Sequence, residues 1–173
     1  ALFGARPRRA AAFAGRADAC LATSAAWAGR AVVVCSVIQS PLIADADTGC
    51  GGLLNVQRTV RGYEAAGVAA IQIEDQEMPK KCGHTPGRRV VSAEDMVLKI
   101  KVAAEARRDE ATLIVARTDA RTALGLDEAL RRARLYEEAG ADIIFVESPE
   151  NEAELERIGK EVSKPLLANM VEF

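Results

Sequence analysis

Two short stretches of the sequence combine residue types and spacings that can do chemistry. In the first, Asp45 and Asp47 stand at positions i and i+2, and on a β-strand such residues point to the same side. In the second, residues 79–84 read Pro-Lys-Lys-Cys-Gly-His and place the Cys82 thiol between two lysines and the only histidine, His84. Paired carboxylates suit a hard cation, and neighbouring positive charges favour a thiolate, so together they indicate metal-assisted proton chemistry.

The composition excludes several classes of protein. A net charge of -2 and 4% aromatic residues give no basis for nucleic-acid binding. The four cysteines (Cys20, Cys35, Cys50 and Cys82) lack the close paired spacing of a zinc ribbon or a small disulfide scaffold, so a reducing compartment is expected. No uncharged apolar run reaches the roughly 18 residues of a membrane span. We therefore expect one cytoplasmic domain that binds neither nucleic acid nor membrane.

The N-terminal region has a different composition from the rest. Residues 1–31 contain 13 alanines, and residues 1–44 contain five arginines and a single acid, Asp18. This bias resembles an organellar transit peptide, and an Ala-rich helix is the alternative. Because the chain begins at Ala1 rather than Met, we favour an incomplete or unusual N-terminus; a targeting segment would imply an organellar location. We predict an unmatched segment at residues 1–38 and a catalytic domain at residues 39–173.

From about residue 40 onward, short apolar runs alternate with stretches of helical spacing. Each run ends in polar residues: 41–47, 68–75, 112–119, 141–147 and 164–169. Strands that alternate with helices are typical of βαβ units, which build a parallel sheet.

Local signals mark the ends of the expected helices. Ser92 with Asp95 is a helix N-cap signal. Residues 63–67 (YEAAG) and 136–140 (YEEAG) form a weak internal repeat, and each ends in a glycine suited to the position that follows a helix. Each copy precedes an apolar run, which supports a repeated helix–strand unit.

The polar strand ends favour a barrel among the parallel-sheet folds. A (β/α)8 barrel gathers the carboxyl ends of its strands into one ring, where active sites form. A doubly wound sheet would carry a glycine-rich phosphate turn after an early strand. Residues 48–52 are glycine-rich but lack the G-x-G-x-x-G spacing, and two acids that would repel a phosphate precede them. We therefore predict an α/β fold of the (β/α)8 TIM-barrel type.

Four motifs occur in the order seen in the isocitrate lyase / phosphoenolpyruvate mutase superfamily. They are residues 42–49, 73–76, 80–84 and 116–119. The chain is most similar to small members, the 2-methylisocitrate lyases and the plant petal-death and carboxyphosphonoenolpyruvate-mutase-like proteins. Within that superfamily, the Lys-Lys-Cys-Gly-His loop marks the carbon–carbon lyases.

The resemblance implies a Mg²⁺ site. Asp45 matches a direct ligand, whereas Asp47 and Glu74 match acids that act through water. Hard oxygen ligands that leave several waters in place suit Mg²⁺ better than zinc. The alternative is that these acids only cap the helices that follow.

The resemblance also implies the reaction. It is a Mg²⁺-dependent cleavage of 2-methylisocitrate, or of a related substituted malate, to pyruvate or another 2-oxo acid and a succinate-type acid. Cys82 matches the general acid/base, and Lys80, Lys81 and His84 would favour its thiolate. The alternatives for Cys82 are an inert thiol or a zinc site with His84, for which the spacing is too tight.

The remaining matches concern the small carboxylic-acid substrate. Arg117 matches a carboxylate binder, for which its planar guanidinium is suited. Gly83, Glu147 and Asn169 match other substrate-contact positions. For Arg117, a salt bridge to Asp119 or Glu147 is the alternative.

The sequence also departs from the family pattern. Residues 1–38 contain no recognisable Ser-Gly-Gly substrate loop and no further metal-shell aspartate, and the chain stops at Phe173. We therefore expect a barrel incomplete at both ends, without the region that the family uses for homo-oligomer assembly. A phosphonomutase, an oxaloacetate hydrolase and a catalytically inactive fragment remain as alternative functions.

Overall fold

The computed structural model describes residues 12–14, 24–82, 85 and 87–169, and within them the strands form one parallel sheet. The strands pair in chain order. Their bounds are β1 (Ala12–Ala14), β2 (Leu42–Asp45), β3 (Ala70–Glu74), β4 (Leu113–Thr118), β5 (Ile143–Val146) and β6 (Leu166–Leu167). A doubly wound sheet reverses its strand order at a switch point, whereas a barrel does not, so this order is that of a (β/α)8 barrel.

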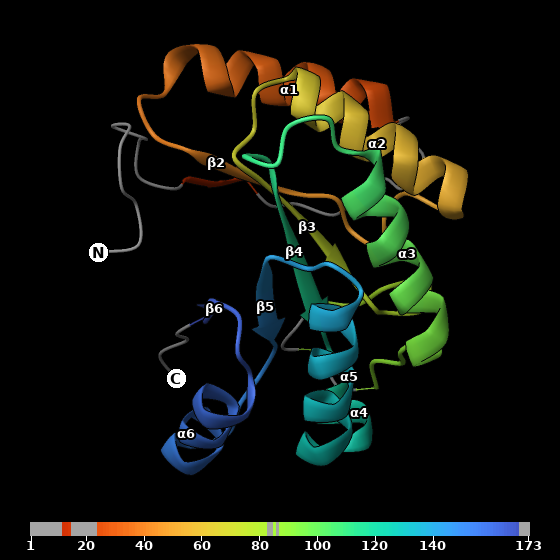
Figure 1. Ribbon diagram of the computed structural model, residues 1–173, viewed down its shortest axis with the longest axis vertical. Helices are drawn as coiled ribbons and strands as arrows, with labels where there is room; N and C mark the ends of the chain where they lie inside the picture. The colour runs from red at the N-terminus through yellow and green to blue at the C-terminus, as the bar shows by residue number, and fades with distance from the viewer. Residues whose placement is uncertain (1–11, 15–23, 83–84, 86, 170–173) are drawn as a thin grey trace.

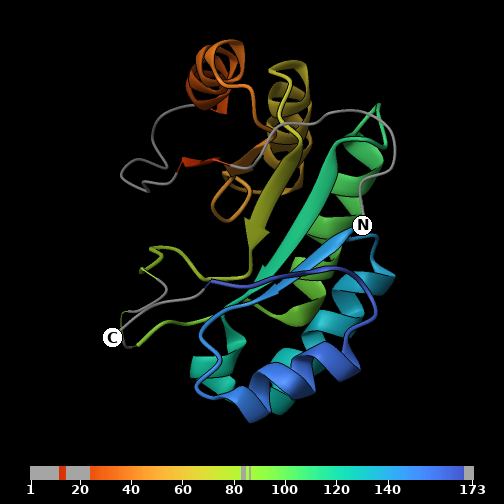
Figure 2. The same cartoon turned by 90° about the vertical axis from the view of Figure 1, so that its left-hand side faces the viewer.

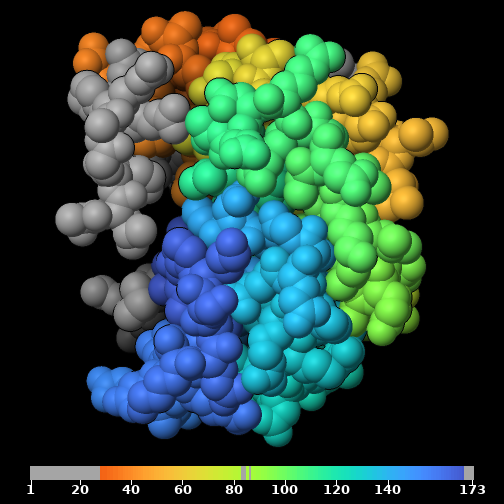
Figure 3. Space-filling view, viewed as in Figure 1, coloured from red at the N-terminus to blue at the C-terminus, as the bar shows by residue number. Residues whose placement is uncertain are grey.

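Helices connect successive strands and lie outside the curved sheet (Figures 1 and 2). Their bounds are α1 (Ser24–Val37), α2 (Leu53–Ala65), α3 (Ala93–Ala106), α4 (Ala120–Leu124), α5 (Leu126–Glu138) and α6 (Glu152–Glu161). In the space-filling view of Figure 3 the helices form a continuous outer surface, from α1 (orange) at the top to α6 (blue) at the lower left. The predicted α/β class and its parallel sheet are confirmed.

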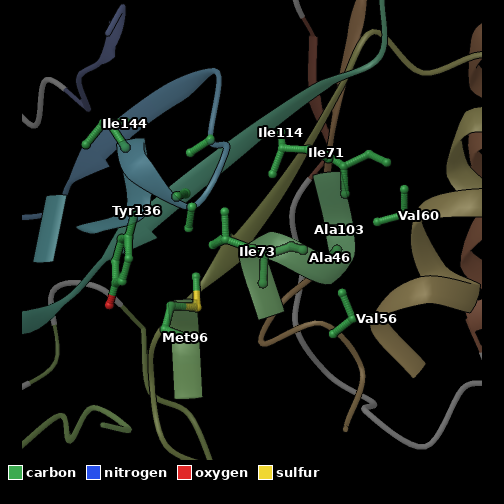
Figure 4. Packing of buried hydrophobic residues seen from close by; sticks show 14 of the residues in the cluster. Ala46, Val56, Val60, Ile71, Ile73, Met96, Ala103, Ile114, Tyr136 and Ile144 are labelled. Carbon is green, nitrogen blue, oxygen red and sulfur yellow. The ribbon is translucent and has the colours of Figure 1, made fainter. Parts of the chain in front are cut away.

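Successive side chains along each strand alternate between two faces. One face packs against the helices, and the other faces the inside of the curved sheet. Ile71 and Ile73 of β3 and Ile114 of β4 pack with Met96 of α3 and Tyr136 of α5 in the main core, and each is fully buried (Figure 4). Full burial of such side chains contributes about 1.5–3 kcal/mol each. This layer fixes which face of every strand turns away from the helices.

The opposite face of the strands carries a smaller apolar cluster. It contains Ala70, Val115 and Phe145, with Ile43 and Leu113 packed against them. In a strand every second residue shares a face, so positions 45, 74, 117 and 147 belong to this inner face. The packing of the helices therefore directs the polar strand ends inward.

The predicted helix ends occur where the sequence places them. The Ser92 hydroxyl accepts a hydrogen bond from the Asp95 N–H at 3.0 Å and caps α3. Gly67 and Gly140 follow α2 and α5 with φ of +83° and +106°, a conformation that favours glycine. These signals are local, which explains why they can be read from the sequence.

Part of the N-terminal region belongs to the same sheet and helix layer. Ala12 of β1 pairs with Leu42 of β2, and α1 packs on α2 with Ala28 beside Gly62. The division at residue 38 stays a prediction. Within the described part of the chain, no helix is long and apolar enough to cross a membrane.

The two copies of the internal repeat place tyrosines in corresponding positions. Tyr63 near the end of α2 donates to the Asp45 carbonyl at 3.3 Å, whereas Tyr136 near the end of α5 donates to the Asp75 carboxylate at 2.8 Å. Asp75 also accepts from the Thr118 hydroxyl at 2.7 Å and from Arg132 at 3.1 Å. Asp75 is fully buried, so this network satisfies a charge that burial would otherwise penalise.

We predict that Tyr136→Phe lowers the free energy of unfolding more than Tyr63→Phe. The first variant removes a short hydrogen bond to a buried carboxylate, which contributes about 1.5–3 kcal/mol, and the second removes a longer bond to a neutral carbonyl, which contributes about 0.5–1.5 kcal/mol. Urea unfolding of both variants measures the difference. Equal losses would contradict the assigned role of the Asp75 network.

Candidate active site

The carboxyl ends of the strands bring the predicted site residues to one edge of the sheet. The register pairs Asp45 with Gln72, Glu74 with Arg117, and Arg117 with Phe145. Side chains of paired residues in a parallel sheet lie side by side on the same face. Glu74 and Arg117, which are 43 positions apart in the sequence, are thus neighbours.

A tight turn after β2 orients the two aspartates. The Asp45 carboxylate accepts from the Asp47 N–H at 2.8 Å, and the Asp47 carboxylate accepts from the Thr48 N–H at 2.9 Å. Asp47 has a φ of 59°, in the left-handed region that aspartate tolerates better than most residues. Lys99 of α3 donates to the Thr48 carbonyl at 2.8 Å and holds the turn from outside.

The Lys80 ammonium lies between two of the acids. Its Nζ is 3.4 Å from Asp47 Oδ1 and 3.2 Å from Glu74 Oε1, and only 13% of the side chain is exposed. Burial alone would lower the pKa of Lys80, but the charges of Glu74, Asp45 and Asp47 raise it above its ordinary value. We expected Lys80 to act on the Cys82 thiol, whereas in the structure its ammonium contacts the carboxylates of Asp47 and Glu74.

The acids fit the predicted Mg²⁺ in their chemistry. Asp47 and Glu74 already converge on one cation, the Lys80 ammonium, and Asp45 adds its charge to the same place. Among the described residues, no group of three His, Cys, Asp or Glu side chains is arranged to hold a metal. Mg²⁺ is usually bound by one or two carboxylates and keeps several waters, so two converging carboxylates are sufficient.

Arg117 is held in one orientation at the end of β4. Its Nε and Nη2 donate to the two oxygens of Asp119 at 2.8 and 3.0 Å, and its Nη1 lies 3.3 Å from Glu147 Oε2. The guanidinium carbon is 5.1 Å from the centre of the Phe145 ring, a cation–π distance. Both salt-bridge partners considered from the sequence are therefore in contact with Arg117, which is compatible with carboxylate binding by a preorganised guanidinium.

Glu74 is an almost completely buried acid whose pKa is shifted by that burial. Its side chain is 1% exposed, and burial raises its pKa to about 7, although Arg117 and Lys80 lower it. The charges of Asp119 and Asp45 also raise it. A carboxyl with this pKa changes its charge near neutral pH, where a bound cation would favour its ionised form.

The segment that carries Cys82 extends beyond the end of β3 (Figure 2). Cys82 and Lys81 are exposed, and Cys82 is a free thiol. The predicted residues Gly83 and His84 lie outside the described residues. At the other strands, Glu147 is 1% exposed beyond β5, and Asn169 is exposed after β6.

Two residues near the site were not predicted from the sequence. Arg88 is 7% exposed and donates to Asp119 Oδ1 and to the Thr122 hydroxyl, both at 2.6 Å, so it shares Asp119 with Arg117. No local spacing signals this contact, since 31 positions separate Arg88 from Asp119. Gln72 is fully buried beside Asp45, and its amide has no hydrogen bond among the described residues. The period of two that relates Gln72 to Glu74 could have identified it.

A parallel α/β sheet in barrel order, with polar side chains gathered at the carboxyl ends of its strands, is typical of the (β/α)8-barrel enzymes, whose active sites lie at that end. The sequence model of the phosphoenolpyruvate phosphomutase family matches residues 7–172. The chain belongs to this family, and the resemblance found from its motifs is confirmed.

Two similar curated relatives have the names of lyases. The chain is 56% identical over 158 residues to the 2,3-dimethylmalate lyase of Eubacterium barkeri, covering 91% of this chain and 55% of the relative. It is 58% identical over 137 residues to the 2-methylisocitrate lyase of Aeropyrum pernix, covering 79% of this chain and 44% of the relative. The chain thus spans about half the length of these relatives.

Solved structures agree with the fold. A crystal structure of 2,3-dimethylmalate lyase, a member of the PEP mutase/isocitrate lyase superfamily, superposes with a TM-score of 0.84 at 36% identity, covering 91% of this chain and 54% of that chain. A structure of phosphonopyruvate hydrolase in complex with oxalate and Mg²⁺ superposes with a TM-score of 0.73 at 36% identity, covering 84% of this chain and 51% of that chain. The predicted fold class is confirmed.

We predict that Glu74 makes stability depend on pH. Its native pKa of about 7 lies above its ordinary value of 4.5, so between these values the native state binds more protons than the unfolded state. The free energy of unfolding therefore falls as pH rises through this window. Glu74→Gln cannot ionise, so its stability relative to the unchanged protein should rise by on the order of 3 kcal/mol between pH 4.5 and 8. Urea unfolding of both proteins across this range measures the difference, and parallel curves would contradict it.

Proposed function

We propose that this chain supplies the metal- and carboxylate-binding part of a Mg²⁺-dependent carbon–carbon lyase. The observation that carries the proposal is the convergence of Asp47 and Glu74 on one cation beside the fixed guanidinium of Arg117. A cluster of acids beside an arginine suits a ligand that chelates a metal with one end and presents a carboxylate to the arginine with its other end.

The substrate class follows from this arrangement. A substituted malate carries a hydroxyl and a carboxylate on one carbon, and both could approach a cation held by Asp45, with Asp47 and Glu74 acting through water. The chemistry supplied by Mg²⁺ when bound is polarisation of those oxygens. Arg117 would bind a substrate carboxylate, since its contacts with Asp119 and Phe145 fix the plane of the guanidinium before the substrate arrives.

The exposed thiol of Cys82 supplies the proton transfer. When the carbon–carbon bond breaks, the hydroxyl gives its proton to water, and the carbon that carries it becomes the carbonyl of a 2-oxo acid. The electron pair remains on the adjacent carbon, delocalised into its carboxylate, and takes a proton from Cys82. With 2-methylisocitrate the products are pyruvate and succinate, and with 2,3-dimethylmalate they are pyruvate and propionate.

The lyase function is favoured over the phosphonate chemistry of other family members by the loop residues. Lys80, Lys81 and Cys82 belong to the Lys-Lys-Cys-Gly-His loop that marks carbon–carbon lyases in the superfamily. The two curated relatives described above carry the names of lyases that act on 2,3-dimethylmalate and 2-methylisocitrate. Either substrate fits the chemistry of the pocket.

We predict that a protein of full family length containing this chain releases pyruvate from 2,3-dimethylmalate or 2-methylisocitrate in the presence of Mg²⁺. The remaining residues can be taken from the Eubacterium barkeri lyase, to which this chain is 56% identical. Cys82→Ser should lower kcat by at least about 10²-fold, because the hydroxyl is a much weaker acid than the thiol. Coupled detection of pyruvate measures turnover.

The control is Cys35→Ser, a partly buried thiol on α1, which should leave turnover largely unchanged. Turnover retained in Cys82→Ser would remove Cys82 from the mechanism. If the protein that retains Cys82 releases pyruvate from neither substrate, the proposed function is overturned.

We also predict that Lys80→Met increases the affinity for Mg²⁺ by about 10-fold, because a cation that competes for the same carboxylates is removed. Lys81→Met, in which the neighbouring exposed lysine is changed, is the matched control and should have a much smaller effect. Calorimetric titration with Mg²⁺ compares the variants. Equal affinities in the two variants would show that Lys80 does not compete with the metal.

A further inference from the structure

Gln76 makes an unusual pair of contacts beside the proposed catalytic thiol. Its side-chain Nε2 donates to the Lys81 carbonyl at 2.9 Å, and its Oε1 accepts from the Lys81 N–H at 3.0 Å. Both backbone groups of one residue are therefore bound by one side-chain amide. Gln76 is 2% exposed, so these bonds form away from competing water.

The residue that is bound lies between the two residues with proposed chemical roles. Lys80 precedes it and directs its ammonium to Asp47 and Glu74. Cys82 follows it and carries the exposed thiol. Fixing the backbone of Lys81 therefore fixes where both neighbouring side chains begin.

Gln76 is itself held rigidly. It lies two residues after the end of β3, forms an isolated antiparallel bridge with Val90, and is followed by Glu77, whose N–H donates to the Arg89 carbonyl at 2.9 Å. In the part of the segment that returns toward the sheet, Arg88 is bound to Asp119. The amide of Gln76 thus connects Lys81 to the part of the segment near the sheet, where residues 76–77 are hydrogen-bonded to residues 89–90.

A second buried glutamine, Gln72, shows that burial alone does not explain the hydrogen bonds of Gln76. Gln72 lies four positions earlier and is equally buried, and its side-chain amide has no hydrogen bond among the described residues. Gln76 instead satisfies both its donor and its acceptor on Lys81. Two such bonds, formed on both backbone groups of one residue, favour a single conformation of this short surface segment.

We infer that Gln76 is a positioning residue for Cys82: its amide binds the Lys81 backbone and holds the thiol at a set place relative to the acids of β2 and β3. The inference rests on the proposed function for its catalytic consequence, but the mechanical part stands on the hydrogen bonds alone. The first experiment tests the mechanical part, and the second tests the consequence.

The first experiment is limited proteolysis of the chain with trypsin, which cleaves after Lys80 and Lys81. Gln76→Met removes both hydrogen bonds with little change in size, and we expect cleavage at these two sites to become about 10-fold faster. Gln76→Glu keeps the acceptor for the Lys81 N–H but places an oxygen against the Lys81 carbonyl, so it should also accelerate cleavage. Gln72→Met removes an equally buried amide and should leave these rates unchanged.

The outcomes are distinct when all tryptic sites are followed by mass spectrometry. Acceleration confined to Lys80 and Lys81 in both Gln76 variants supports the inference. Unchanged rates in Gln76→Met, or equal acceleration at all sites, such as after Arg107 and Arg134, would overturn it. The second pattern would mean that Gln76 supports the whole fold rather than the loop.

The second experiment uses the full-length protein described above. Gln76→Met should lower kcat by about 10-fold or more while KM changes little, because a displaced thiol affects proton transfer rather than the binding of the substrate carboxylates. A rise in KM with unchanged kcat would overturn the catalytic role of Gln76. If the unchanged protein releases no pyruvate, the proposed function fails, whereas the trypsin result still decides whether Gln76 holds the loop.

Discussion

Electrostatic balance among three neighbouring acids, one of them fully buried, governs this end of the molecule. Asp45, Asp47 and Glu74 are brought together by the pairing of β2 with β3, and Glu74 is almost completely removed from water. The negative charges of neighbouring carboxylates repel one another unless a cation lies among them. Lys80 supplies that cation from the loop and Arg117 supplies a second from β4. The same need for a positive charge makes the pocket suitable for a divalent metal.

This balance connects the loop to the sheet. Lys80 can reach the acids only if residues 76–82 return over the end of β3, and the amide of Gln76 binds the Lys81 backbone in that position. The thiol of Cys82 follows directly. Placement of the proposed general acid and neutralisation of the acidic cluster therefore depend on the same short segment, so a change in one is expected to disturb the other.

Away from the pocket, a second buried network supports the strand ends. Asp75 accepts hydrogen bonds from Thr118, Tyr136 and Arg132, and Asp119 joins Arg117 to Arg88. Asp75 points to the helix side of β3, whereas Glu74 points inward, since adjacent strand residues alternate between faces. At the end of β3, Asp75 therefore takes part in the packing with the helices, and the preceding residue, Glu74, belongs to the proposed site.

The sequence by itself determined the features that depend on local physics. The alternation of strands and helices, the Ser92 cap, the glycines after α2 and α5 and the polar ends of the strands all follow from backbone preference and periodicity, and the structure has them where they were expected. The barrel class and the family also followed, because several motifs occurred in order. The roles of Asp45, Cys82 and Arg117 remain predictions.

Only the tertiary structure decided that Lys80 contacts the acids, that Arg88 shares Asp119 with Arg117, and that Gln76 holds Lys81. The direction of the Lys80 side chain and the contacts of Arg88 depend on strand register and on the path of the loop, and even the short-range bond of Gln76 requires a chain reversal that no spacing in the sequence specifies.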